Sequence, residues 1–133
     1  MKARAVRRNH FTHTVEIRGG QHTITADEPK QTGGDDQGPS PQELLAASLA
    51  SCSAVTLEMY ADRKGWNLGN VTVSVNYEPA QRGSPTRFEI DVKLPSDLPE
   101  EQRERLMQIV ARCPVHRTLE GEVIFAEKVS LAE

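Results

Sequence analysis

Two cysteine side chains offer the most direct chemistry in this sequence. Cys52 lies in a stretch of small and apolar residues, and Cys113 closes an apolar stripe further along the chain. Taken alone, each is also consistent with a buried, inert thiol, because free cysteine often packs as a small hydrophobe. We expect both on inward-facing positions, where they could meet, and two neighbouring thiols can cycle between dithiol and disulfide.

The expected surroundings of the two thiols differ. Cys113 is predicted at the C-terminus of a helix, where the helix dipole disfavours a thiolate. The positive charges of Arg112 and Arg117 act in the opposite direction. Cys52 is predicted more than two turns from either end of its own helix, so the dipole gives its thiol little help. A reactive Cys52 therefore needs a cation or a hydrogen-bond donor from elsewhere.

Glu43 is a third candidate for the chemistry. Its position three residues after Ser40 is also that of a capping box, which is a purely structural role. Ten helical residues rise about 15 Å, so neither Gln42 nor Glu43 can reach Cys52 along one straight helix. If a carboxylate from this turn assists the thiol, it must come from another subunit or from a broken helix start.

The histidine residues give no strong metal signature. Cys113 and His116 have a C-x-x-H spacing, and His10, His13 and His22 lie near the N-terminus. A structural zinc site needs four ligands in paired spacing, and the sequence has no second pair. The glycine residues also fail to match a phosphate-binding loop or a dinucleotide fingerprint. We therefore expect no metal site.

Alternation of apolar and polar residues predicts three strands near the N-terminus, over residues 3–8, 13–18 and 21–26. Gly19 and Gly20 separate the second and third strands and are typical of a tight hairpin. Residues 27–39 contain four acidic residues, three glycines and two prolines, so we expect a loop there.

A long helix is predicted over residues 40–64. Ser40 fits the N-cap, Pro41 fits the first helical position, and Gly65 fits the C-terminal end. Residues 44–57 are uncharged and apolar or small nearly all round, which is typical of a buried helix. A second copy of the chain could pack against it.

The C-terminal half completes an α+β pattern. Residues 71–77 and 87–94 alternate and predict a second hairpin, and residues 99–113 have the spacing of an amphipathic helix. Pro114 ends or kinks that helix, a short turn follows through Thr118, and residues 122–129 are predicted as a last strand. This order indicates a largely antiparallel sheet, a central buried helix and a second amphipathic helix. Tyr60 and Trp66 are expected in the core.

Length and charge narrow the class of protein. The 133 residues are expected to form a single domain, residues 1–133, with a core that needs no disulfides. The net charge of −3 argues against nucleic acid as a partner, because phosphate contacts need a basic face. No run of about 18 apolar residues occurs, and no apolar segment follows the basic residues 1–9. We therefore expect a cytoplasmic protein without a membrane span or signal peptide, in a compartment where structural disulfides are uncommon.

Three segments resemble one protein family. They are GPSPQELLAASLASC at residues 38–52, MYADRKGW at residues 59–66 and RCPVHRTLEG at residues 112–121. The first resembles the active-site helix of the OsmC/Ohr family, the osmotically inducible and organic hydroperoxide resistance proteins. The other two resemble one bacterial OsmC-like branch in particular. The match in order and spacing covers nearly the whole chain.

The resemblance implies an α+β fold in an intertwined homodimer, with two active sites at the interface. It also implies a thiol peroxidase for organic hydroperoxides, in which Cys52 is the peroxidatic cysteine and Cys113 the resolving one. An external dithiol of the lipoyl type would reset the enzyme. No metal or bound organic cofactor is implied.

One position departs from the family pattern. In the organic hydroperoxide resistance branch, a glutamate ten residues before the peroxidatic cysteine partners an activating arginine. Gln42 stands at that position here, with Glu43 beside it. The arginine of those relatives belongs near the N-terminus, and Arg7 and Arg8 lie in about that region.

Three functions are consistent with these residues, and each predicts different behaviour. A hydroperoxide reductase, which we favour, forms a reversible Cys52–Cys113 disulfide when it meets peroxide. The main alternative is a binding protein of the same fold that holds an apolar ligand at the dimer interface, with little or no peroxidase turnover. In a structural protein the cysteines merely pack, so Cys52→Ser and Cys113→Ser cost a little stability and nothing else.

Overall fold

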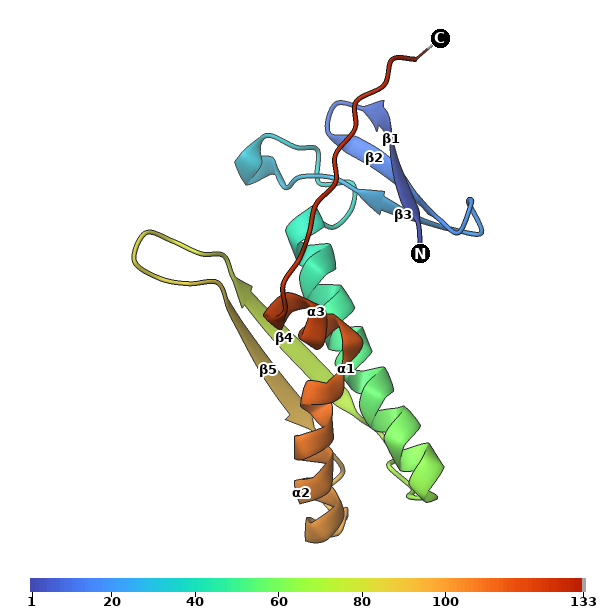
Figure 1. The fold of residues 1–133 in the computed structure, drawn as a ribbon, viewed down its shortest axis with the longest axis vertical. Helices are drawn as coiled ribbons and strands as arrows, with labels where there is room; N and C mark the ends of the chain where they lie inside the picture. Colours follow the sequence, from blue (N-terminus) through green and yellow to red (C-terminus); the bar gives the residue numbers. More distant parts are fainter. Residues whose placement is uncertain (133) are drawn as a thin grey trace. The chain divides into compact units, whose positions relative to one another are not determined.

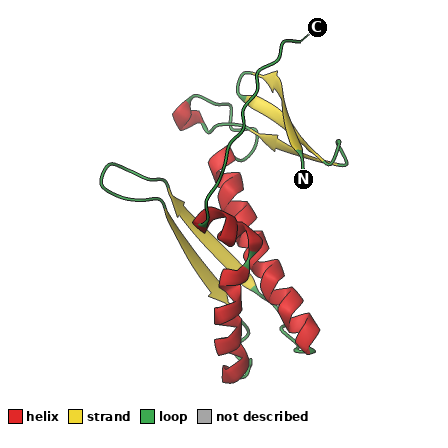
Figure 2. Ribbon diagram, viewed as in Figure 1, coloured by secondary structure: helices red, strands yellow, loops and turns green. Residues whose placement is uncertain are grey.

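The computed structural model describes residues 1–132, which form two compact units. Unit 1 comprises Met1–Ser48 and Val75–Glu89, and unit 2 comprises Leu49–Ser74 and the chain from Ile90 onward. The elements in chain order are β1 (Ala3–Asn9), β2 (Thr12–Ile17), β3 (His22–Ala26), η1 (Lys30–Thr32), α1 (Pro41–Lys64), β4 (Thr72–Glu78), β5 (Arg87–Lys93), α2 (Glu100–Ile109), η2 (Val110–Arg112) and α3 (Pro114–Glu120) (Figure 1). This mixture of strands and helices confirms the predicted α+β class (Figure 2). That residues 1–133 form one domain stays a prediction.

Unit 1 holds a three-stranded antiparallel sheet in the order β1–β2–β3. The register pairs Val15 of β2 with Ile24 of β3. Gly19 and Gly20 have positive φ angles of 66° and 95°, which glycine adopts without a steric cost, so the hairpin turns there. The three predicted N-terminal strands and their hairpin are thus confirmed.

A buried carboxylate organises the loop that follows β3. Asp27 is only 1% exposed. Thr12 Oγ1 donates to Asp27 Oδ2 at 2.7 Å, and the backbone N–H groups of Glu28 and Gln37 donate to the carboxylate at 2.7 and 3.2 Å. Burial acts to raise the pKa of Asp27, but these hydrogen bonds outweigh it and hold the pKa below its ordinary value. The predicted loop over residues 27–39 is therefore organised by hydrogen bonds to the Asp27 carboxylate, and it includes the short helix η1.

Helix α1 begins with the predicted capping box. The Ser40 N–H donates to Glu43 Oε1 at 2.9 Å, and the Glu43 N–H donates to Ser40 Oγ at 3.2 Å. Pro41 is the first helical residue, where the missing N–H costs nothing. Gly65 follows the last residue with a φ of 72°, which explains why the helix ends there.

The single chain buries only one side of α1. The buried residues recur at helical spacing: Leu49, Ser53, Leu57, Tyr60 and Ala61. On the other side, Val55 is 48% exposed and Met59 is 58% exposed. The predicted central helix is confirmed, and within one chain its own elements cover a single face of α1.

Strands β4 and β5 pair in a two-stranded sheet, as predicted for the second hairpin. Half-buried and exposed residues alternate strictly along both strands. The rings of Tyr77 and Phe88 stack on the half-buried face with their centroids 4.8 Å apart.

Unit 2 has its own hydrophobic core, formed by residues of α1, α2 and the segments beside them: Leu57, Tyr60, Ala61, Leu68, Leu98, Leu106 and Ile109. Trp66 packs against this core and meets the Tyr60 ring edge-on, with the centroids 5.7 Å apart. Arg105 Nε of α2 donates to the Tyr60 hydroxyl at 2.9 Å, which ties α2 to α1. The prediction that Tyr60 and Trp66 belong to the core is confirmed.

The predicted helix over residues 99–113 is shorter than expected. Helix α2 ends at Ile109, the 3-10 turn η2 follows, and Cys113 lies outside both with φ −54° and ψ 129°. Pro114 is the cause, because a residue before proline is disfavoured in the helical region. The apolar stripe itself is confirmed, since Leu106, Ile109 and Cys113 are at most 2% exposed.

A helix replaces the short turn predicted through Thr118. Helix α3 begins at Pro114, and the Cys113 side chain accepts the His116 N–H at its start. Proline suits the first position of a helix because its φ is already helical. The predicted turn was therefore wrong, because Pro114 ends one helical segment and begins another.

The strand predicted over residues 122–129 is also absent from the described chain. Residues 121–132 form neither helix nor strand, and Ile124 is 87% exposed and Phe125 81% exposed. A strand needs a neighbour for its backbone N–H and C=O groups. None of the described strands pairs with this segment, so its apolar alternation alone did not make it a strand.

The expectation that the chain has no membrane span stays a prediction, because the length and composition of helix α1 are only weak evidence for a span. One 18-residue window of α1 has a mean hydropathy of 1.4, so its length and composition suffice for a span. The core helix of a soluble protein passes the same test, and 22% of this window is buried within the chain.

Candidate active site

The side chains of Cys52 and Cys113 are in contact within unit 2. Both are free thiols, and Cys113 is close enough to Cys52 to raise the pKa of the Cys52 thiol. Cys52 comes from α1 and is half-buried, whereas Cys113 comes from the junction of η2 and α3 and is fully buried. The structure thus brings together the two thiols that were expected to face one interior. Neighbouring sulfur atoms of this kind can be oxidised to a disulfide.

Cys113 stands at the start of a helix, not at the end of one. Its Sγ accepts the His116 backbone N–H at 3.4 Å, and its carbonyl oxygen accepts the Arg117 N–H at 3.0 Å. The positive end of the α3 dipole therefore lies at this sulfur, which is opposite to the prediction. The prediction was wrong because Pro114 begins a new helix directly after Cys113.

The Cys52 thiol is held in its neutral form within the single chain. Burial raises the pKa of Cys52 above its ordinary value, and the hydrogen bond to Cys113 raises the pKa further. The Val115 backbone and the Thr56 side chain hydrogen-bond to Cys52 and lower the pKa without reversing the shift. A reactive Cys52 therefore requires a further cation, in line with the expectation from its position in mid-helix.

Ser53, the next residue of α1 after Cys52, has an unpaired hydroxyl among the described residues. It is fully buried, and its Oγ has no hydrogen-bond partner within residues 1–132. A buried hydroxyl without a hydrogen-bond partner lowers the free energy of unfolding, and a water molecule or another polar group at Ser53 Oγ would remove this cost. Nothing in the sequence distinguished Ser53, because small residues in an apolar helix are equally typical of close packing.

Glu43 belongs to unit 1, and its carboxylate is engaged in the helix cap. Hydrogen bonds from the backbone and side chain of Ser40 lower the pKa of Glu43, so the group is a carboxylate at neutral pH. The capping role of Glu43 is therefore clear from the geometry. Its predicted catalytic role stays a prediction.

The histidine side chains of the described residues make pairwise contacts and do not gather into a metal-ligating cluster. Within residues 1–132 no cluster of three or more potential metal-ligating side chains occurs. His116 Nδ1 lies 3.1 Å from the Ala111 carbonyl oxygen, and His116 Nε2 lies 3.1 Å from Glu120 Oε1. His10 Nδ1 faces Asp35 Oδ2 at 3.4 Å. In the C-x-x-H motif, His116 thus contacts Ala111 and Glu120 of its own segment, whereas Cys113 lies near Cys52 of α1.

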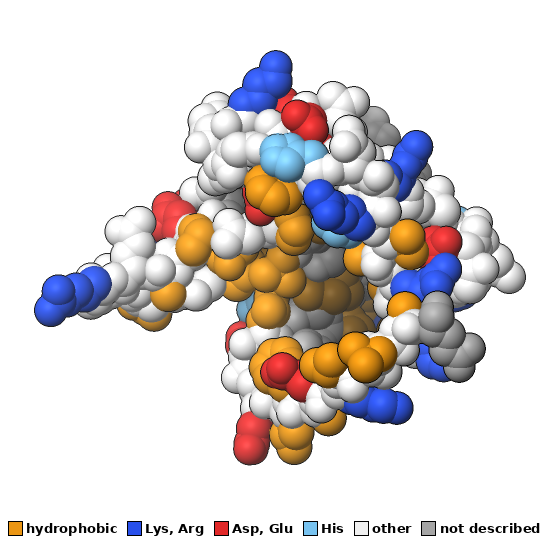
Figure 3. All heavy atoms as spheres, turned by 90° about the horizontal axis from the view of Figure 1, so that it is seen from above, with side chains coloured by type: hydrophobic (Ala, Val, Ile, Leu, Met, Phe, Trp, Pro, Cys, Tyr) orange, Lys and Arg blue, Asp and Glu red, His pale blue; other side chains and the backbone are white. Residues whose placement is uncertain are grey.

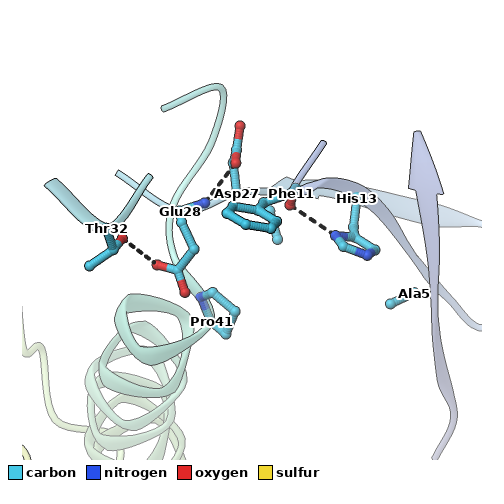
Figure 4. A pocket seen from close by; sticks show the side chains of 8 residues that line it. Ala5, Phe11, His13, Asp27, Glu28, Thr32 and Pro41 are labelled. Carbon is cyan, nitrogen blue, oxygen red and sulfur yellow. Dashed lines mark hydrogen bonds between the residues drawn. The ribbon is translucent and has the colours of Figure 1, made fainter. Parts of the chain in front are cut away.

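Unit 1 contains an open, largely apolar cavity of about 540 Å³ (Figure 4). It is lined by residues of β1, β2 and β3, of the turn between β1 and β2, of the loop after β3, and by the first residue of α1: Ala5, Phe11, His13, Ala26, Asp27, Glu28, Thr32 and Pro41. The Phe11 side chain at this cavity is 45% exposed. The volume lies in the range of small-molecule sites, roughly 300–1,000 Å³.

Large apolar side chains remain open on the surface of the single chain (Figure 3). On α1 they include Val55 and Met59, and in the C-terminal segment they include Ile124, Phe125 and Leu131. The three C-terminal side chains are 81–93% exposed. Exposed apolar surface of this extent is typical of an interaction surface.

Comparisons with known proteins agree on one fold. The family model described as OsmC-like protein matches residues 33–128, which is more than half of the chain. The chain is similar to the solved structure of an OsmC-like protein from Mycoplasma pneumoniae, with a TM-score of 0.74, 24% identity, and coverage of 90% of this chain and 86% of the other.

Two further solved structures carry the name organic hydroperoxide resistance protein. One, from Legionella pneumophila, gives a TM-score of 0.62 at 20% identity and covers 91% of this chain and 90% of its own. The other, OhrB of Bacillus subtilis, gives a TM-score of 0.60 at 18% identity and covers 91% of this chain and 92% of its own. At these identities the likeness shows the fold alone. A search of functionally curated proteins finds no matching relative.

Proposed function

This chain belongs to the OsmC-like protein family, and from that premise we propose that it is a cytoplasmic thiol peroxidase that reduces organic hydroperoxides. The observation that carries the proposal is the contact between the Cys52 and Cys113 thiols. The two structural relatives named as organic hydroperoxide resistance proteins support the same class of substrate. We propose Cys52 as the peroxidatic cysteine and Cys113 as the resolving one.

The proposed cycle has three steps that balance in atoms and electrons. The Cys52 thiolate attacks the O–O bond and becomes a sulfenic acid, while the organic alkoxide leaves and is protonated to the alcohol. The Cys113 thiol then displaces the sulfenic hydroxyl as water and forms the Cys52–Cys113 disulfide. An external dithiol of the lipoyl type reduces this disulfide and is itself oxidised to a disulfide. Because the two thiols are already in contact, the second step needs little movement.

We propose that the active form is a homodimer, in which the second copy supplies what one chain lacks. The raised pKa of Cys52 calls for a cation, and the exposed Val55 and Met59 on α1 offer an apolar surface for a second copy. Arg7 and Arg8 are the candidate activating arginines. Arg7 Nε donates to the His10 carbonyl oxygen at 2.8 Å, whereas Arg8 lines a polar cavity of unit 1. Light scattering coupled to gel filtration measures the oligomeric state directly, and a monomer at micromolar concentration would contradict this part of the proposal.

We propose Glu43 as a third catalytic residue, which acts on the thiol of another subunit. Glu43→Gln removes the charge, and Ser40→Ala is the matched control because each change disturbs one side of the same capping box. If Glu43 assists the thiol, Glu43→Gln lowers turnover while Ser40→Ala does not. Equal turnover in the two variants would confine Glu43 to its role in the cap.

The direct test is turnover of an organic hydroperoxide and of hydrogen peroxide, with dihydrolipoamide as the reductant. We expect the wild type to consume the organic hydroperoxide faster, and Cys52→Ser to abolish turnover. Cys113→Ser should still react once with peroxide but should form no intramolecular disulfide. A wild type no faster than Cys52→Ser would overturn the proposed function.

The apolar cavity of unit 1 favours one alternative, a binding protein for an apolar ligand with little peroxidase turnover. Its volume of about 540 Å³ and its Phe11 wall suit a fatty-acid-like chain. Equilibrium binding of a fluorescent fatty acid to wild type and to Phe11→Ala tests this alternative. Tight binding that Phe11→Ala weakens, together with absent turnover, would favour it over the peroxidase.

A further inference from the structure

The C-terminal segment, residues 122–131, has the side-chain pattern of a strand but no strand beside it. Apolar residues recur at every second position, interrupted by Glu127: Val123, Phe125, Val129 and Leu131. Phe125, Val129 and Leu131 are 81–93% exposed, and no described strand pairs with the segment. A chain that adds to the edge of a sheet satisfies its backbone hydrogen bonds and covers alternate side chains together. The segment therefore lacks an open strand edge to pair with.

Strand β1 offers such an edge in unit 1. The strand order β1–β2–β3 leaves one side of β1 and one side of β3 without a neighbouring strand. Beside β3, the Gly38 backbone lies so close to the Thr25 carbonyl that an added Cβ would overlap it, and the Asp27 N–H donates to the Pro39 carbonyl oxygen at 3.1 Å. The loop thus covers part of β3, whereas all seven residues of β1 are exposed.

Charge favours β1 as the partner of the C-terminal segment. Strand β1 contains three arginines and no acidic residue, whereas β4 and β5 contain Glu78, Glu89 and Asp91. Glu127 lies in the middle of the C-terminal segment. Within residues 1–132 neither Arg7 nor Glu127 forms an ion pair. Opposite charges on facing positions of two strands stabilise their pairing.

One antiparallel register satisfies both the charges and the apolar side chains. With Glu127 opposite Arg7, Val129 lies opposite Ala5 and Leu131 opposite Ala3. Ala5 is paired with Val15 of β2, and Val15 with Ile24 of β3. Val129 would therefore extend this apolar row across a fourth strand. The irregularity in β1 between Arg7 and Asn9 ends the regular edge at Arg7, where the ion pair would lie.

The neighbouring registers are less favourable. An antiparallel shift by two residues places Lys128 beside Arg4 or Arg8, depending on its direction. A parallel pairing with Glu127 opposite Arg7 also places Lys128 beside Arg8. Like charges on facing positions destabilise a strand pair. A shift by one residue moves the apolar row of the segment to the other face of the sheet.

We propose that residues 127–131 of a second copy pair antiparallel with residues 3–7 of β1, with Glu127 opposite Arg7. The single chain leaves both partners unpaired, and in a two-fold dimer each copy gives its own segment and receives the other. Arg7 then serves the strand contact, which leaves Arg8 as the candidate for activating the thiol. This proposal rests on the homodimer of the proposed function and on none of its peroxidase chemistry.

The test uses disulfide crosslinking of the full-length variant Ala5→Cys with Val129→Cys. Facing residues of antiparallel strands have Cα atoms about 4.5–5.5 Å apart, which suits a disulfide. After oxidation at micromolar protein concentration, a non-reducing gel separates a link between copies from a link within one chain. Peptide mass spectrometry distinguishes the new link from links of Cys52 and Cys113. We expect a covalent dimer joined through positions 5 and 129.

Two further pairs make the crosslinking result specific. Val6→Cys with Val129→Cys is the matched control, because Val6 is on the other face of β1 and should give no link. Ala3→Cys with Leu131→Cys tests the same register and replaces the first pair if that variant does not fold. A link within one chain, or no link in either pair of this register, would overturn the proposal.

Charge reversal tests the proposed ion pair. In the crosslinking variant, Glu127→Arg should slow formation of the link by roughly threefold to tenfold, because two like charges then face each other. Arg7→Glu together with Glu127→Arg should restore the rate. Glu122→Arg is the matched control, since position 122 lies beyond the end of β1 in this register. Equal slowing by Glu122→Arg and Glu127→Arg would overturn the assigned register.

The outcomes also separate this proposal from the proposed function. A protein that is dimeric by light scattering but forms no link through positions 5 and 129 would reject the strand pairing alone. The expected link in a protein without hydroperoxide turnover would reject the peroxidase alone.

Discussion

Leu106 anchors α2 in the core of unit 2, so its truncation should destabilise the protein strongly. Leu106 is 0% exposed and belongs to the core cluster of this unit. Leu106→Ala removes three buried carbon groups, a loss of roughly 2.4 kcal/mol at about 0.8 kcal/mol for each. The cavity left behind adds to this loss, and measured core Leu→Ala changes span about 2.7–5.0 kcal/mol. We therefore expect the free energy of unfolding to fall by about 3–4 kcal/mol.

The assay is urea unfolding followed by circular dichroism at one fixed protein concentration, because the stability of a dimer depends on concentration. Met107→Ala is the matched control, since Met107 is the next residue of α2 and is 52% exposed. Its cost should stay below about 0.5 kcal/mol. For a chain of this length the expected loss at Leu106 corresponds to a decrease in Tm of roughly 12 °C. A Leu106→Ala cost no larger than that of Met107→Ala would refute the packing argument.

Three further predictions concern polar groups. Ser53→Ala should raise the free energy of unfolding by about 1 kcal/mol, because it removes an unpaired buried hydroxyl, and a loss in urea unfolding would mean that the hydroxyl has a partner. Cys113→Ala should lower the pKa of Cys52, because it removes a hydrogen bond and a charge that raise it, and the pH dependence of alkylation measures this. The low pKa of Asp27 stabilises the fold above about pH 4, and this contribution is lost as the pH falls through the lower folded-state pKa. Asp27→Asn should therefore be less stable than wild type at neutral pH, with a difference that shrinks in acid; a difference independent of pH would contradict the role of the carboxylate.

Local patterns were sufficient to predict most of the elements. The capping box at Ser40 and Glu43, the glycine pair at Gly19 and Gly20, and the strict alternation of β4 and β5 each act within a few residues. Such signals do not depend on distant parts of the chain, so the sequence alone revealed them. The approach of the two cysteines was also predictable, because Cys52 lies in an apolar helix and Cys113 closes the apolar stripe of another.

The predictions that were wrong concern features that local periodicity does not determine. The strand expected over residues 122–129 has apolar alternation, but a strand also needs a neighbour, which the described chain does not provide. The exposed Val55 and Met59 of α1 likewise show that local periodicity does not say what covers each face of a helix. At Cys113, one proline changed a helix end into a helix start, and this reversed the sign of the dipole at the thiol. The unpaired Ser53 hydroxyl was hidden because hydrogen-bond partners follow from tertiary packing.

The central claim is that Cys52 and Cys113 form one redox pair. Its most direct test treats the reduced protein with one equivalent of an organic hydroperoxide and measures the intact mass. We predict that wild type loses the mass of two hydrogens as the disulfide forms, that Cys113→Ser gains one oxygen as the sulfenic acid, and that Cys52→Ser is unchanged. A wild-type protein that keeps its mass and both free thiols would contradict the claim.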